Sequence, residues 1–467
     1  MRYVNSLVAL ATMSLSLPFA ALAQDALTYK DQEKLHDIAA AVQADRIEAD
    51  IEKLVSFGTR HTLSETESDS RGIGAARRWI YEEFKRISAD CGGCLEVMYV
   101  SDVIEGETRI PDAPEVKSVI AIQRGTTDPG RYVLMSGDID SRVSDVMDST
   151  SDAPGANDNA SGVAGTLEAA RVLSQYQFDG SVVYAALAGE EQGLFGGKIL
   201  AEKAKQQNWR IHAVLNNDMI GNIEGINGVI NNTTARIFAE GTRMDETDRE
   251  ATMRRFYGGE VDSPSRNVAR YVDLMADRYI KNLDTMIVYR LDRFGRGGHH
   301  RPFNDLGYPG VRIMETNENY YRQHQDLRTE NGIEYGDTID GVDFDYAAKL
   351  TALNAVSLAG MAWAPEPPQN VDIEGAVQPS TTLKWDDVSG QENVAGYKIY
   401  WRLTSEPQWQ WSRYVGDVNE FTLENVVIDN YIFGVASVSD DGFESPVVFP
   451  GPAGEFSIDF EGEGDQQ

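Results

Sequence analysis

The stretch SVVYAALAGEEQGLFGGK, residues 181–198, decides the class of fold that this chain can form. Its apolar run from residue 182 to 188 is typical of a strand that is buried on both faces. Two carboxylates, Glu190 and Glu191, follow Gly189 at the end of this run. A solvated turn is the ordinary explanation of such a pair, because adjacent negative charges repel and burying either one is costly. The rest of the chain must therefore decide between a turn and a functional site.

Short apolar runs and helical patterns alternate on both sides of this strand. This alternation predicts an α/β fold, with helices on both faces of a twisted, mostly parallel sheet. The other predicted strands are residues 117–125, 131–138, 211–221 and 310–315, and the predicted helices include residues 162–176, 196–207, 269–282 and 345–362. In such sheets ligands bind at the carboxyl ends of the strands, which is where Glu190 and Glu191 fall.

The pattern changes after the proline-rich stretch WAPEPPQNV, residues 363–371, which cannot continue a helix. Short strands of period two follow, and they predict a small all-β immunoglobulin-like sandwich. Trp385, Tyr397, Tyr431 and the GFESP stretch resemble a fibronectin type III domain. The expected domains are a signal peptide (1–23), an α/β domain (24–364), a fibronectin type III-like domain (365–453) and an acidic tail (454–467).

Charge and targeting signals restrict the partners and the compartment of the chain. The 467 residues carry a net charge of −32, which argues against binding to nucleic acid or to an anionic membrane. Arg2, an apolar run and the small residues 21–23 are typical of a signal peptide, so we expect a secreted or periplasmic protein. No later run is long enough for a membrane span. Cys91 and Cys94 are expected to form a small structural disulfide, as suits an exported protein.

Acidic residues or a histidine follow several of the predicted strands. These residues are Asp138, Asp140, Asp158, Glu190, Glu191, Asp218 and His324. Carboxylates that converge on one crevice repel each other by several kcal/mol unless a cation lies among them. Oxygen and imidazole ligands together suit zinc. The sequence therefore predicts a zinc site at the carboxyl edge of the sheet.

Five motifs carry a resemblance to a known family. They are APGANDNASGVAGTLEAARVL, AGEEQGLFGGKILA, LNNDMIG, HRPF and YYRQHQD, and they occur in this order within residues 45–364. The chain resembles metallopeptidase family 28, the co-catalytic di-zinc aminopeptidases of the bacterial leucyl aminopeptidase and aminopeptidase Y type. The resemblance implies the zinc-exopeptidase fold, two zinc ions per chain, and a peptide or protein substrate that loses N-terminal residues.

The resemblance also implies a role for each acidic residue. Asp158 would bridge the two ions, and Glu191 and His324 would complete the first ion's ligands. Asp138 and Asp218 would complete those of the second ion. Glu190 would be the general base that takes a proton from a metal-bound water and returns it to the leaving amine. Asp140 would orient its neighbours.

The chain departs from the family pattern at two positions. The family normally has histidine where this chain has Asp138, and it often has aspartate where this chain has His299. Two alternatives to an active aminopeptidase therefore stay open: a catalytically impaired relative that binds peptides or partners, and a carboxypeptidase of the same superfamily. An intact Glu190 favours an active enzyme.

The positions of several further residues in the sequence suggest where they lie. His300 is expected to hydrogen-bond substrate in the pocket, with a role as metal ligand as the alternative, and His61 is expected at the rim or surface. Arg142 is expected at the site or in a surface ion pair. The segment between Gly221 and Gly298 is expected to shape the pocket, with candidates Arg254, Arg255, Tyr257 and Tyr289.

Overall fold

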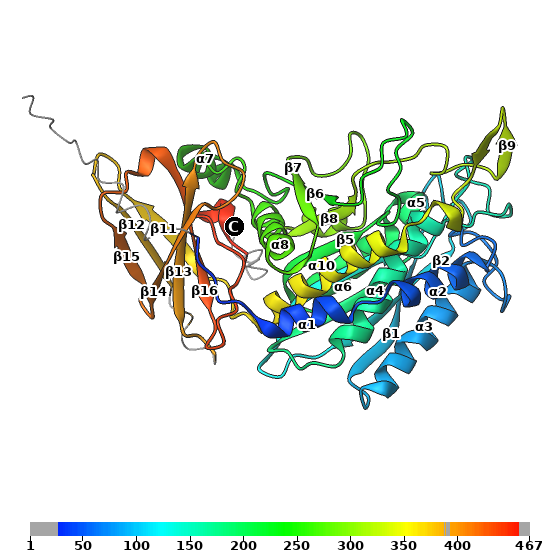
Figure 1. Ribbon diagram of the computed structural model, residues 1–467, viewed down its shortest axis with the longest axis horizontal. Helices are drawn as coiled ribbons and strands as arrows, with labels where there is room; N and C mark the ends of the chain where they lie inside the picture. Colours follow the sequence, from blue (N-terminus) through cyan, green and yellow to red (C-terminus); the bar gives the residue numbers. More distant parts are fainter. Residues whose placement is uncertain (1–26, 387, 389–392, 457–467) are drawn as a thin grey trace, which may run out of the picture.

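The computed structural model describes residues 27–386, 388 and 393–456 (Figure 1). The predicted signal peptide and most of the predicted acidic tail lie outside these residues. The described part contains two units, an α/β domain and a smaller all-β unit beside it. Among the described residues, no helix has the length and apolar character needed to cross a membrane.

An eight-stranded sheet forms the centre of the α/β domain, with the strand order β1-β2-β4-β3-β5-β8-β6-β7. The four strands β4, β3, β5 and β8 are mutually parallel, whereas β1, β2 and β6 join through antiparallel pairs. The strands are β1 (Leu95–Val103), β2 (Glu115–Gln123), β3 (Asp128–Asp138), β4 (Gly180–Leu187), β5 (Arg210–Asn217), β6 (Thr234–Ala239), β7 (Asp284–Val288) and β8 (Gly310–Glu315). The predicted class of fold is confirmed, and its parallel part is the centre of a mixed sheet.

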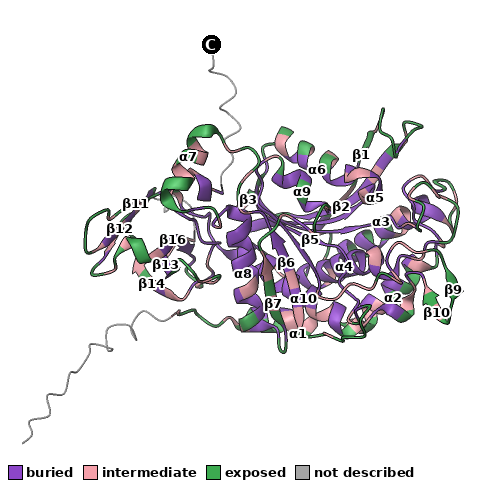
Figure 2. Cartoon of the chain, turned by 90° about the horizontal axis from the view of Figure 1, so that it is seen from above, coloured by how far each residue is buried: buried purple, intermediate pink, exposed green. Residues whose placement is uncertain are grey.

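Two apolar layers cover the sheet, one on each face. Side chains of β4 alternate between the layers: Val182 joins the larger layer and Val183 the smaller one. The larger layer contains α1 (Glu33–Ala41), α2 (Ala44–Val55), α3 (Gly72–Asp90), α4 (Ser161–Leu173), α8 (Pro264–Tyr279) and α10 (Phe344–Trp363), and the smaller one contains α6 (Phe195–Gln206) and α9 (His300–Asn304). Figure 2 shows the buried strands between these helices. The continuous apolar pattern of β4 follows from this burial on both faces.

The all-β unit is a pair of three-stranded antiparallel sheets. One has the order β11-β12-β15 and the other β14-β13-β16. The strands are β11 (Gln369–Glu374), β12 (Thr381–Asp386), β13 (Gly396–Leu403), β14 (Trp411–Gly416), β15 (Glu420–Leu423) and β16 (Tyr431–Val438). Trp385 packs against Tyr397 in its core, with ring centroids 5.3 Å apart. A separate β unit is therefore present, while its assignment to the fibronectin type III class stays a prediction.

The remaining elements are short or lie at the edges of the two units. They are the π-helical turn η2 (Ala156–Ala160), α5 (Glu190–Gly193), α7 (Asp248–Tyr257) and the small hairpin of β9 (Arg328–Glu330) and β10 (Ile333–Tyr335). The predicted disulfide is present between Cys91 and Cys94, just after α3.

Buried ion pairs and aromatic contacts join the β unit to the α/β domain. Asp262, before α8, accepts hydrogen bonds from Arg270 of α8 and Arg402 of β13, all at 2.8 Å. These side chains are at most 1 % exposed. Trp363 at the end of α10 packs against Phe443, with ring centroids 4.9 Å apart. The two units therefore pack against each other through a buried interface.

We expect Asp262→Asn to lower the free energy of unfolding by about 3–5 kcal/mol, because it leaves two buried guanidinium groups without their carboxylate. The matched control is Glu374→Gln in β11, which removes the exposed Glu374–Lys384 pair and should change the free energy of unfolding far less. Urea unfolding followed by tryptophan fluorescence measures both. Equal effects of the two substitutions would contradict a buried electrostatic boundary.

Candidate metal centre

The carboxyl ends of the four parallel strands carry the predicted site residues. Asp138 is the last residue of β3, and Asp218 directly follows β5. Glu190 and Glu191 begin α5 after β4, and His324 lies in the loop after β8. Parallel strands end at one edge of a sheet, so their register brings these side chains together. The Glu190–Glu191 pair is therefore part of a site and not of a solvated turn.

Three of the predicted ligands form a compact cluster. The Nε2 atom of His324 lies 2.9 Å from Oε1 of Glu191 and 3.0 Å from Oδ2 of Asp158. Potential ligand atoms of all three residues lie within 4.8 Å of one another. Carboxylate oxygens and an imidazole nitrogen are all ligands that zinc accepts, and a catalytic zinc site has three protein ligands.

Arg142 closes the outer side of this cluster. Its Nε donates to Oε2 of Glu191 at 2.8 Å, and its Nη2 lies 2.7 Å from Nδ1 of His324. Burial alone disfavours a charged His324, yet Glu191 and Asp158 outweigh it and raise the pKa of His324 to about 9. The same contact with His324 holds the pKa of the Asp158 carboxyl below its ordinary value despite burial. Arg142 is thus a member of the site and not of a surface ion pair.

The carboxylate of Asp337 holds the turn that carries Asp158. The backbone amide of Asp158 donates to Oδ2 of Asp337 at 2.7 Å, and the amide of Asn157 donates to the same carboxylate. Gly155 has a φ of +51°, and a Cβ there would lie 2.4 Å from the Cβ of Ser141. Glycine is therefore required at 155, where the backbone is left-handed and crowded. This turn aims Asp158 into the site.

Asp140 holds the two glutamates by their backbone. Its Oδ1 accepts from the amide of Glu190 at 3.2 Å, and its Oδ2 accepts from the amide of Glu191 at 3.0 Å. Thr62 donates to the same carboxylate at 3.0 Å. Asp140 is 1 % exposed, so these contacts are shielded from water. It occupies the orienting position that the resemblance implied, and it acts on the start of α5.

Glu190 faces an open cavity. Burial raises its pKa well above the ordinary value, and the charge of Glu191 adds to this rise. The cavity has a volume of about 430 Å³ and also exposes Glu191 and His324. Its other charged lining residues are Arg109, Arg142, Lys198, Arg296, Arg301 and Asp305. A substrate in this cavity would meet Glu190 together with Glu191 and His324 of the three-residue cluster.

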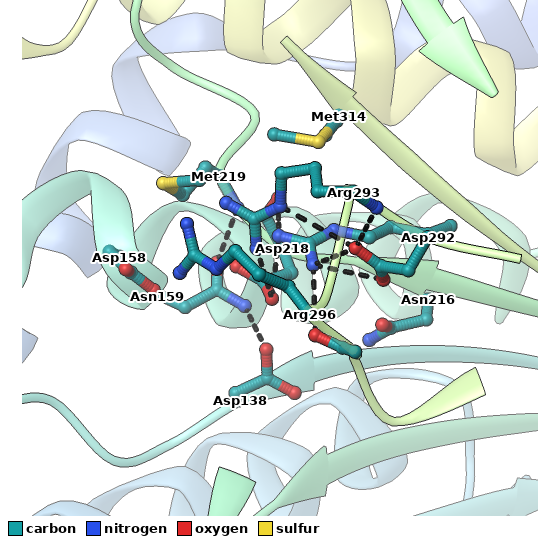
Figure 3. Close-up of polar contacts among 12 residues, drawn as sticks. Asp138, Asp158, Asn159, Asn216, Asp218, Met219, Asp292, Arg293, Arg296 and Met314 are labelled. Atoms are coloured by element: carbon teal, nitrogen blue, oxygen red, sulfur yellow. Dashed lines mark hydrogen bonds and ion pairs between the residues drawn. The ribbon is translucent and has the colours of Figure 1, made fainter. Parts of the chain in front are cut away.

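Asp138 and Asp218 lie outside the three-residue cluster and have other partners. Asp138 accepts a hydrogen bond from Asn159 at 2.6 Å, and its Oδ1 lies 2.5 Å from Nδ1 of His299. Asp218 pairs with Arg312 of β8 at 2.8 Å, and Figure 3 shows where Asp138, Asn159 and Asp218 lie. Burial raises the pKa of each of these two carboxyls to about 8. The predicted ligands of the second ion therefore have protein partners in this structure.

His300, His61 and Tyr257 lie elsewhere than expected, whereas the expectation that the segment between Gly221 and Gly298 shapes the pocket is confirmed by Gly295, Arg296 and Gly297, which line the cavity. His300 is fully buried and lies 2.8 Å from the carbonyl of Leu291, away from the cavity. His61 is also fully buried, and its Nε2 lies 2.9 Å from the carbonyl of Val146. Tyr257 of α7 packs on Gly451 beside the β unit. The sequence does not predict these positions, because the residues that surround each of them come from distant parts of the chain.

Other parts of the segment between Gly221 and Gly298 also differ from the expectation. Arg254 pairs with Glu246 at 2.7 Å, and the guanidinium of Arg266 lies over the ring of Tyr289. The part that reaches the site is instead the loop of residues 291–298, which supplies Arg296 to the cavity. His299, one of the two departures from the family pattern, is buried and lies against Asp138 at the carboxyl edge of the sheet.

Several residues of the site gave no signal in the sequence. They are Thr62, Arg109, Asp292, Arg293, Arg312 and Asp337. Each acts through a partner more than ten residues away or through strand register, so local patterns do not reveal it. Arg312 is the exception, because a charged residue inside the predicted strand GVRIME conflicts with burial and indicates a buried anion, although not which one.

The chain is similar in sequence and in fold to known proteins. Residues 118–338 match the model of peptidase family M28. A "probable zinc metalloprotease" of Leptosphaeria maculans is 44 % identical over 422 residues, which are 90 % of this chain and 97 % of the relative. Another from Pyrenophora teres f. teres is 41 % identical over 464 residues, 95 % of this chain and 96 % of the relative. The chain belongs to peptidase family M28.

Solved structures agree on the fold. The Legionella pneumophila LapA aminopeptidase superposes with a TM-score of 0.53 at 18 % identity, covering 77 % of this chain and 78 % of that chain. LapB from the same organism gives 0.50 at 19 % identity, covering 74 % and 81 %. At these identities the likeness concerns the fold alone.

We expect Asp140→Asn to weaken zinc binding about 10–100-fold, because the substitution removes the anionic acceptor that fixes both glutamate amides. Asp145→Asn is the matched control, since Asp145 caps the exposed amide of Met147 away from the cluster. Competition with a zinc-binding dye measures both affinities. Unchanged affinity in Asp140→Asn would show that α5 keeps its position without this carboxylate.

Proposed function

We propose that this protein is a zinc-dependent exopeptidase that releases N-terminal residues from peptides, with Glu190 as the general base. The observation that carries the proposal is the cluster of Asp158, Glu191 and His324, of which Glu191 and His324 line an open cavity together with Glu190. Membership of peptidase family M28 and relatives named as zinc metalloproteases support it. LapA, which shares the fold, is named an aminopeptidase, and this is consistent with the removal of N-terminal residues.

The three-residue cluster fits a zinc ion by its donor set and its spacing. Asp158, Glu191 and His324 would hold the ion, which when bound polarises the scissile carbonyl and acidifies a water molecule. Arg142 and Asp140 keep Glu191 in place through its side chain and its backbone. The proposal requires this one ion, and the predicted second ion at Asp138 and Asp218 is not needed for it.

Glu190 is suited to move the proton. Its carboxylate takes a proton from the attacking water, whose oxygen bonds to the scissile carbonyl carbon. The C–N bond then breaks, and Glu190 returns the proton to the departing amine nitrogen. Burial and the charge of Glu191 raise the pKa of Glu190, and a higher pKa makes the carboxylate a stronger acceptor for the proton of the water.

The rim of the cavity favours an anionic group on the substrate. Lys198 of α6, Arg301 of α9 and the exposed Arg109 face it, against the single rim carboxylate of Asp305. These cations stand out in a chain with a net charge of −32. They would attract either an acidic side chain or the C-terminal carboxylate of a short peptide, and the latter makes carboxypeptidase action the second candidate.

We also propose that the protein is exported. The disulfide between Cys91 and Cys94 supports an oxidising compartment, where such bonds persist. N-terminal sequencing of the protein from the culture medium and the periplasm tests this, with a mature start near residue 24 as the expected result.

We expect Glu190→Gln to lower kcat at least about 100-fold while the protein keeps its zinc, because the amide cannot accept the proton. Glu191→Gln should instead lose the ion, and the exposed Glu202→Gln on α6 is the control for both. Release of amine from a panel of aminoacyl fluorogenic substrates, with and without a chelator, gives kcat, and elemental analysis gives the metal. Full activity in Glu190→Gln would exclude it as the base.

The same panel of substrates also distinguishes an aminopeptidase from a carboxypeptidase. It includes aminoacyl substrates and N-terminally blocked peptides with a free or an amidated C-terminus. Cleavage of aminoacyl substrates supports the aminopeptidase, whereas cleavage of only the blocked peptides with a free carboxylate supports the carboxypeptidase. No turnover of any substrate by folded, zinc-loaded protein would contradict both.

We expect Lys198→Glu to raise KM for acidic substrates about 5-fold or more at low salt, with a smaller effect at high salt, because exposed charges are screened. Lys203→Glu makes the same change of charge on α6, outside the cavity lining, and should leave KM unchanged. Equal KM values for acidic and neutral substrates in the unsubstituted protein would show that the rim does not select anions.

A further inference from the structure

Guanidinium groups lie on the side of the site where a second metal ion is expected from the resemblance. Figure 3 shows Arg293 and Arg296 reaching from one loop toward Asp218 and Asp158. The Nη2 atom of Arg293 lies 4.0 Å from Oδ2 of Asp218. Positive charge of the protein itself thus faces the carboxylates that would otherwise bind this ion.

Arg312 provides the closest of these charges, and its place is fixed by contacts outside the site. Its Nη2 lies 2.8 Å from Oδ2 of Asp218, while its Nη1 donates to Asp292 and to the carbonyl of Gly297, each at 3.1 Å. The side chain is fully buried. It also stands in β8 directly opposite Asn216 of β5, two residues before Asp218. Strand register therefore brings this guanidinium to Asp218.

Arg293 is anchored in the same manner. Its Nη1 donates to Glu318 at 2.9 Å, and only 8 % of its side chain is exposed. A buried guanidinium stays charged at any physiological pH, so it acts as a permanent cation beside a carboxylate. Neither arginine can leave this position without losing a second carboxylate partner.

The remaining donors do not form a zinc site. Both oxygens of Asp138 have partners, Oδ2 in Asn159 and Oδ1 in His299. Oδ1 of Asp218 is the oxygen of these two carboxylates that lacks a hydrogen bond in the described part of the chain. Nε2 of His299 also lacks a hydrogen bond in the described part of the chain, but Asp138, Asp218 and His299 do not form there a group of three ligand atoms within 4.8 Å of one another. Two separate donors next to a guanidinium are a poor start for a dication, which needs about four ligands and is repelled by the neighbouring charge.

We propose that this chain binds a single zinc ion, at Asp158, Glu191 and His324, and that the buried guanidinium of Arg312, backed by Arg293, takes the place of a second metal ion at Asp218. Arg312 is then a positioning residue. It neutralises Asp218 and keeps the carboxyl edge of β5 next to that of β8. The inference shares its first zinc site with the proposed function, and its test counts ions without using catalysis.

The test is the number of zinc ions per chain in the full protein. The purified chain is stripped with a chelator, reloaded in excess zinc chloride, freed of unbound metal and weighed by native mass spectrometry. The expected count is one. A count of two overturns the inference and leaves the proposed function intact, whereas a count of zero overturns the zinc site on which both depend.

Substitutions show which residues hold the counted ion. Asp218→Asn and Asp138→Asn should each keep one zinc, whereas Glu191→Gln should lose it. Loss of an ion in Asp218→Asn equal to that in Glu191→Gln would also overturn the inference. These variants keep the size of the side chain and leave Arg312 its contact with Asp292.

Arg312→Met tests the exchange of a guanidinium for a metal ion directly. The substitution removes the guanidinium that pairs with the carboxylates of Asp218 and Asp292. These carboxylates are then free to bind a metal ion, so the zinc count should rise from one toward two in excess zinc. A folded Arg312→Met protein that still binds one ion would contradict the role given to Arg312. If this variant does not fold, the counts for the unsubstituted chain and for Asp218→Asn decide the question.

Discussion

The structure depends on balancing the negative charge at the carboxyl edge of four parallel strands. Carboxylates from β3, β4 and β5 meet there within a mostly buried space, where unpaired charges would cost several kcal/mol each. Each finds a different partner: His324 for Glu191 and Asp158, Arg312 for Asp218, and His299 for Asp138. Strand order and register supply these partners, so the electrostatic balance and the sheet stabilise each other.

Two of the carboxylates are balanced by backbone amides. Asp140 accepts from the amides that begin α5, and Asp337 accepts from the amides of the turn that carries Asp158. These hydrogen bonds fix the position of the backbone as well as balancing charge. They fix backbone segments that have no regular hydrogen-bonding of their own, and so they hold Glu190 and Asp158 at set positions on a rigid sheet.

The sequence predicts the sheet and the acidic side of the site, but not the basic side. Strand β4 and the acids after it are visible because burial on both faces leaves a continuous apolar run and the charges that end it stand out. The function of Arg312 depends instead on its pairing with Asn216 across β5 and β8, which no local pattern encodes. His61 and His300 were misplaced for the same reason, since their burial comes from segments far along the chain.

The two departures from the family pattern explain each other once the structure is known. Where the resemblance implies histidine at 138 and aspartate at 299, this chain has the reverse, and the two side chains touch at 2.5 Å. The exchange keeps an imidazole–carboxylate pair but puts the carboxylate on the sheet and the imidazole at the start of α9. One nitrogen donor is thereby lost from the sheet edge and one negative charge is added there. His299 contacts that carboxylate directly, so the exchange keeps its own charge balance, and Arg312 pairs instead with Asp218 and Asp292.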